Sequence, residues 1–92
     1  GKSADEILLT NTPPAVFGEV SAIGRASKEI EVNIGKDDGL QVGHTIHIYR
    51  GNRYVGRAQV VNAHPRRAVA RMLDIYKRSQ PQKGDQVATQ LS

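Results

Sequence analysis

Residues 29–34 read Glu-Ile-Glu-Val-Asn-Ile, an unbroken alternation of polar and aliphatic side chains. Successive side chains of a β-strand point to opposite faces, so this alternation predicts a strand that buries Ile30, Val32 and Ile34 together. Residues Thr45–Arg50 repeat the pattern and predict a second strand with both isoleucines inward. The fold is therefore expected to be built from half-buried strands.

Four less regular segments are expected to form the remaining strands: Phe17–Ile23, 54–63, Ala68–Ile75 and 86–91. Glycine, proline or polar turn formers separate all six segments. Six short strands at this spacing predict an all-β fold, a small six-stranded barrel or barrel-like sandwich. The residues expected to shape its turns are Asp38, Gly39, Gly43, Gly51, Gly84 and Asp85.

The hairpin between the strands at 45–50 and 54–63 has two possible registers. A two-residue loop would bring Arg57 beside the inward Ile46, whereas a three-residue loop, 51–53, places Ala58 there. We prefer the three-residue loop, which also leaves Tyr49 beside Val55. For Ala68–Ile75 the alternation does not decide which face is inside.

Two short stretches, 41–46 and 82–87, resemble one another. Each places a glycine and then a polar residue just before an apolar strand position, at Gly43-His44 and Gly84-Asp85. This spacing predicts two similar strand-entry turns, with glycine at positive φ and the next side chain bound to the backbone.

The first fourteen residues differ from the remainder. Ser3 and Glu6 have the spacing of a helix capping box, which predicts a short helix over 3–9, and Pro13 disfavours its continuation. We expect 1–14 to be a helix and linker belonging to a preceding region, with the barrel domain occupying 15–92.

Basic residues are concentrated in one part of the chain, whose overall net charge is +4. Arg50–Arg78 holds eight basic residues and one acidic residue, and such asymmetry favours an anionic or acidic partner. Arginine forms bidentate contacts with carboxylate or phosphate, and tyrosine adds stacking surface. The candidate anion- or partner-binding face consists of Arg50, Arg53, Arg57, Arg66, Arg67, Arg71 and Tyr49.

The residue patterns give little support for an enzymatic function. The chain has no cysteine, and His44 and His47 lie three apart, so on a strand they face opposite sides and could not share a metal ion. Asp37-Asp38-Gly39 lacks the alternating oxygen ligands of a calcium loop. No nucleophile elbow or paired acid and base is present. We expect no catalytic residues, no metal and no cofactor, and no apolar run approaches the length of a transmembrane helix.

Residues 34–50 resemble small β-barrel domains of bacterial envelope proteins. In those domains a strand ends in glycine, an aspartate-glycine turn and a glycine-aspartate turn follow, and the next strand ends in tyrosine-arginine. The nearest resemblance is to the C-terminal barrel of the flagellar assembly protein T family. The barrel of the rod-shape protein MreC and the glycine-aspartate boxes of cradle-loop barrels are more distant. Gly84-Asp85 matches the glycine-aspartate turn, whereas His44 stands where aspartate is usual.

The resemblance implies a non-catalytic interaction module, the C-terminal domain of a larger envelope-associated bacterial protein. It would bind another protein or itself, with homo-oligomerisation through the N-terminal extension as one form. If the resemblance holds, its compartment is the cell envelope or periplasm. The alternative is a nucleic-acid-binding barrel that uses the basic face between Arg50 and Arg78.

Overall fold

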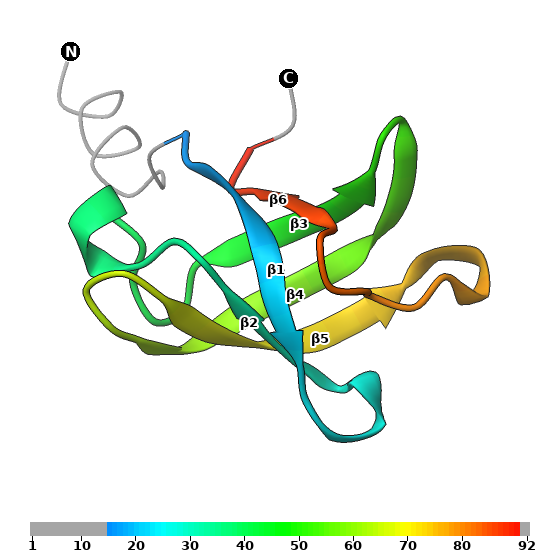
Figure 1. Ribbon diagram of the computed structural model, residues 1–92, viewed down its shortest axis with the longest axis horizontal. Coiled ribbons are helices and arrows are strands. Elements are labelled where there is room, and N and C mark those ends of the chain that lie inside the picture. The colour runs from blue at the N-terminus through cyan, green and yellow to red at the C-terminus, as the bar shows by residue number, and fades with distance from the viewer. Residues whose placement is uncertain (1–14, 91–92) are drawn as a thin grey trace, which may run out of the picture.

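The computed structural model describes residues 15–90. Its strands are β1 (Phe17–Ile23), β2 (Glu29–Val32), β3 (Thr45–Arg50), β4 (Arg53–Ala63), β5 (Ala68–Ile75) and β6 (Gln86–Ala88). Each pairs antiparallel with both neighbours in the closed order β1-β2-β5-β4-β3-β6 (Figure 1). The predicted six-stranded all-β barrel is confirmed, while the helix predicted over 3–9 lies outside the described residues. Within 15–90, no helix is long and apolar enough to span a membrane.

The strand predicted over 29–34 is two residues shorter in the structure. The regular ladder ends at Val32, and Asn33 stays bonded to β1 in another way: its amide donates to the Glu19 carbonyl at 3.0 Å, and its side chain accepts the Glu19 amide at 2.8 Å. Ile34 still lies in the core. The last strand likewise ends at Ala88 rather than at residue 91, and the predicted 54–63 begins at Arg53.

The barrel interior is filled by aliphatic side chains from all six strands. The largest fully buried residues are Val20, Ile30, Val32, Leu40, Ile46, Ile48, Val55, Val60 and Val87. Ala68 and Ala70 are also fully buried, so the interior face of β5 is the one that carries its small residues. Met72, further along the same face, is partly buried and packs against this core. Leu73 and Ile75 are exposed.

The hairpin between β3 and β4 corrects the preferred loop length. Its turn is the two-residue Gly51-Asn52, with Arg50 paired to Arg53 and Tyr49 to Tyr54 rather than to Val55. A β-bulge at Val55 then shifts the register by one residue, so Ile46 still faces Ala58. The extra residue lets a tight turn coexist with a ladder that keeps Arg57 out of the core.

The two similar sequence stretches form turns with matching hydrogen bonds. Gly43 and Gly84 have φ of 96° and 93°. The amide of Gly43 donates to the Val60 carbonyl and that of Gly84 to the Val20 carbonyl, both at 2.8 Å. Each turn therefore fastens the start of one strand to the neighbouring strand.

The residue after each glycine closes its turn with a side-chain acceptor. His44 Nδ1 accepts the Gln41 amide at 3.1 Å, and Asp85 Oδ2 accepts the Gln82 amide at 2.8 Å. In the two turns, an imidazole nitrogen and a carboxylate oxygen therefore serve as equivalent acceptors.

Neighbouring strands of this closed barrel run in opposite directions, so the connections between strands lie at two opposite ends. The β1–β2, β3–β4 and β5–β6 connections all leave the barrel at one end, the three-loop end. The β2–β3 and β4–β5 connections meet at the opposite, two-loop end, where the Lys36 amide donates to the His64 carbonyl at 2.7 Å (Figure 1). Short 3₁₀ turns lie in three of these connections: η1 (Arg25–Ser27), η2 (Lys36–Asp38) and η3 (Tyr76–Arg78).

Candidate functional site

The residues of the sequence-predicted basic face are divided among three parts of the barrel. Arg50 and Arg53 lie at the three-loop end, whereas Arg66 and Arg67 follow β4 at the two-loop end. On the wall between the two ends are Arg57, Arg71 and Tyr49. One face cannot contain all seven residues, because the segment between Arg50 and Arg78 runs the length of the barrel down β4 and back along β5.

Arg50 forms a forked ion pair with Asp85. Its Nε donates to Asp85 Oδ1 at 2.6 Å and its Nη2 to Asp85 Oδ2 at 2.9 Å, while Nη2 also reaches the Gln80 carbonyl at 2.9 Å. The Asp85 side chain is 3% exposed. The hydrogen bond to Asp85 raises the pKa of Arg50 above its ordinary value. This fork joins the end of β3 to the start of β6 and leaves Arg50 unavailable to a partner.

Arg57 is also paired, but on the outer wall. Its Nε and Nη2 donate to Asp74 Oδ2 at 3.0 and 2.8 Å, and its amide donates to Asp74 Oδ1 at 3.2 Å. The hydrogen bond from Arg57 lowers the pKa of Asp74, and the same bond raises the pKa of Arg57. Both side chains are about half exposed, so solvent screens the pair and its contribution to stability is small.

Next to this pair, Tyr54 joins β4 to β3 and to the η3 turn. Tyr54 Oη and His47 Nδ1 lie 3.0 Å apart, and the Tyr54 and Tyr76 rings meet edge to face with centroids 6.0 Å apart. Burial raises the pKa of Tyr54, and the nearby charge of Asp74 acts in the same direction against the smaller effect of Arg57. The folded state therefore holds the Tyr54 proton more tightly than the unfolded state does.

This difference predicts an alkaline loss of stability. Below the ordinary tyrosine pKa of about 10 both states keep the proton, and stability is unaffected. As the pH rises above that value, the unfolded chain ionises first, so the free energy of unfolding falls until the pH passes the folded pKa. Urea unfolding at a series of pH values should give wild type a steeper alkaline loss than Tyr54→Phe. Equal slopes would show that Tyr54 has the same affinity for its proton in both states.

The other predicted arginines make weaker contacts or none. Arg67 Nε lies 3.7 Å from Glu31, and Arg71 Nη2 lies 3.9 Å from Glu29, all on exposed side chains. Arg53 and Arg66 form no ion pair with any acid in the described part of the chain.

The connections and strand ends at the three-loop end carry basic residues from separate parts of the sequence. Its basic side chains without an acidic partner among residues 15–90 are Arg25, Lys28, Arg53, Lys77, Arg78 and Lys83. Arg25 and Lys28 lie outside the segment that sequence reasoning singled out. Their contribution depends on the order of strands in the ring, which brings the β1–β2 connection beside the end of β5.

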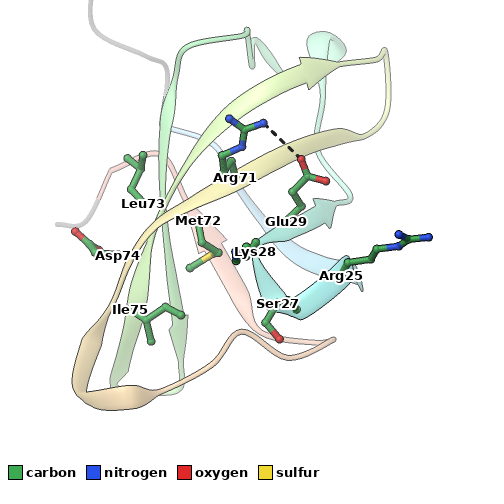
Figure 2. A pocket seen from close by; sticks show the side chains of 10 residues that line it. Arg25, Ser27, Lys28, Glu29, Arg71, Met72, Leu73, Asp74 and Ile75 are labelled. Atoms are coloured by element: carbon green, nitrogen blue, oxygen red, sulfur yellow. Dashed lines mark ion pairs between the residues drawn. The ribbon is translucent and has the colours of Figure 1, made fainter.

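A groove of about 700 Å³ opens between the β1–β2 connection and the last part of β5. Residues 25–29 form one side and 71–75 the other (Figure 2). Met72 and Ile75 extend from β5 toward the connection that carries Ser27 and Lys28, as Figure 2 shows. Sequence reasoning missed this groove, because Met72 and Ile75 come to the same face of β5 only through the register shift between Asp74 and Met72, which side-chain alternation does not reveal.

The predicted histidines do not come together. His44 lies in the turn before β3 and His64 in the β4–β5 connection, whereas His47 contacts Tyr54 on the wall. Among residues 15–90, no group of three or more His, Asp or Glu side chains is placed to hold a metal ion.

Comparison with known proteins gives no relative: no family model, no curated protein and no solved structure matches this chain.

Proposed function

We propose that this chain is a non-catalytic interaction module that binds a negatively charged protein partner at its three-loop end. The observation that carries the proposal is that six cations at this end have no acidic partner in the described chain, and that two of them, Arg25 and Lys28, line a groove of about 700 Å³. A surface of one charge attracts and orients an oppositely charged partner. The groove has the size at which proteins commonly bind ligands.

The arrangement of the titratable side chains supports binding rather than chemistry. The carboxylates nearest to strong cations, Asp85 and Asp74, are engaged by Arg50 and Arg57. The resemblance of residues 34–50 to envelope-protein barrels supports a role as one part of a larger envelope-associated protein, in which this module would supply an attachment point.

Binding to octaglutamate, a peptide that offers carboxylates and no apolar side chain, tests the proposal. At about 50 mM salt the protein should bind this peptide, with the amide resonances of the three-loop end shifting, and binding should weaken at about 200 mM. Arg25→Glu combined with Lys28→Glu should reduce the affinity by about tenfold. The matched control is Arg66→Glu combined with Arg67→Glu, which makes the same charge change at the two-loop end and should leave the affinity nearly unchanged.

Two results would contradict the proposal. Absence of binding at the lower salt concentration would remove the three-loop end as a site for acidic partners. An equal loss of affinity in both double variants would mean that net charge alone governs the interaction.

Nucleic acid is the second candidate, favoured by the same cations together with the exposed Tyr76 beside them. A nucleic-acid site would require that an octanucleotide, single- or double-stranded, bind more tightly than octaglutamate, with a salt dependence of orders of magnitude over the same range. We expect the opposite order, because no aromatic side chain lines the groove.

A further inference from the structure

β5 is longer than the strand that flanks it on one side. It pairs with β4 as far as Ile75, but its ladder with β2 ends at Arg71, followed by one hydrogen bond from the Met72 amide to the Lys28 carbonyl at 2.8 Å. Residues 73–75 therefore have a strand neighbour on one edge only within the described chain. An unpaired strand edge is a template on which another strand can form.

The backbone of the β1–β2 connection keeps this edge open. Ala26 and Ser27 have φ of 55° and 58°, which turns the chain out of the line that β2 would follow if it began earlier. The space left by this detour is the groove between 25–29 and 71–75. Residues 73–75 of the free edge therefore lie along one side of the groove (Figure 2).

The side chains along the groove favour one kind of occupant. Asp74 pairs with Arg57 and Met72 with Ala58, so Leu73 is the extra residue of a β-bulge, and Met72 and Ile75 lie on the same face of β5. These two residues offer aliphatic surface, and Arg25 and Lys28 line the other side with no acidic partner in the described chain. The carboxylates that line the groove are directed to other cations, Glu29 to Arg71 and Asp74 to Arg57. A second copy of this chain would bring the same cations against them, so self-association on this face is opposed by repulsion.

We propose that an extended acidic segment of another protein adds to the free edge of β5 at residues 73–75 as a short additional strand. This rests on the proposed function and identifies the form of the partner. Because side chains alternate along a strand, such a segment alternates aliphatic residues over Met72 and Ile75 with carboxylates toward Arg25 and Lys28. Main-chain hydrogen bonds supply part of the affinity, and the alternation supplies specificity.

The test compares two capped octapeptides of different pattern, alternating valine-glutamate and octaglutamate, against the full chain. The alternating peptide should bind about tenfold more tightly, because it adds aliphatic burial and strand pairing. Amide resonances of residues 25–29 and 71–75 should shift most. Ile75→Asp should abolish this advantage, whereas Val42→Asp, an exposed aliphatic position outside the groove, should preserve it.

Backbone methylation separates strand addition from simple contact between side chains. Only alternate amides of an added strand point toward its neighbour. Two further peptides carry N-methyl groups on the four glutamates or on the four valines, and one of these should lose binding while the other retains it. Equal behaviour of the two methylated peptides would overturn strand addition.

The outcomes also distinguish strand addition from the broader proposal that the three-loop end binds an anionic partner. If octaglutamate binds the three-loop end and the alternating peptide binds no better, strand addition is wrong and the anionic-partner proposal stands. If neither peptide binds, both are wrong. A chemical-shift response confined to residues outside 25–29 and 71–75 would place the alternating peptide at another site and would also overturn the inference.

Discussion

Gly35→Ala should lower the free energy of unfolding by about 3 kcal/mol, one of the two largest losses expected in this barrel. A Cβ at position 35 would stand 2.1 Å from the His64 carbonyl oxygen and 2.6 Å from the Arg67 amide nitrogen. Both are backbone atoms, so they cannot rotate away as a side chain could. The β4–β5 connection would have to move, and with it the hydrogen bond from the Lys36 amide to His64. In thermal unfolding the midpoint should fall by roughly 12–24 °C.

Gly43→Ala is the matched control for this substitution. No atom lies within 4 Å of the position that its Cβ would take, but its φ of +96° is unfavourable for alanine. Its cost should be confined to backbone strain of about 1 kcal/mol. If the two variants lose the same stability, close approach at Gly35 is not what excludes a side chain there.

Asp85→Ala should be comparably severe, with a loss of about 3 kcal/mol in urea unfolding. The buried Asp85 carboxylate accepts two hydrogen bonds from Arg50 and one from the Gln82 amide, so its removal leaves three donors without their acceptor. Arg50 keeps 35% of its side chain in solvent and can be partly hydrated. Because Arg50 can reach solvent, the expected loss of unfolding free energy is at the lower end of the range for breaking a buried ion pair.

Asp74→Ala provides the comparison for Asp85→Ala. It removes a carboxylate with a similar forked contact to an arginine, but on the exposed wall rather than at a buried strand entry. Its effect should be much smaller, because water and salt replace most of what Arg57 supplies. A loss from Asp74→Ala as large as that from Asp85→Ala would contradict the distinction between the two pairs.

The register of the β3–β4 hairpin shows how much of the strand pairing can be predicted from side-chain periodicity. The requirement that Arg57 stay out of the core was enough to place Ala58 opposite Ile46, and the structure has that pair. Periodicity could not distinguish a longer loop from a bulge, because both add one residue. The Val55 bulge changes the local backbone conformation and twist, to which the pattern of polar and apolar residues is insensitive.

For the candidate site, the order of residues along the chain predicted less than the tertiary structure decided. A run of arginines along the chain resembles a face, but β4 and β5 carry successive members of the run to opposite ends of the barrel. The unpaired cations of the three-loop end come from two connections and the start of β4, and two of them, Arg25 and Lys28, precede the run by more than twenty residues. Their placement at the same end of the barrel follows from which strands pair, and that is decided by contacts distant in sequence.

The amino-acid order alone determined that this chain forms six half-buried strands, where three of them begin and end, and which aliphatic residues face inward on β2 and β3. These properties depend on neighbours one or two positions away, within reach of alternation and turn chemistry. Only the tertiary structure decided the inward face of β5, its free edge, and the meeting of that edge with Arg25 and Lys28. The inward face of β5 depends on packing in an interior shared by all six strands, whereas its free edge and the neighbours of that edge depend on which strands pair and where the β2–β5 ladder ends.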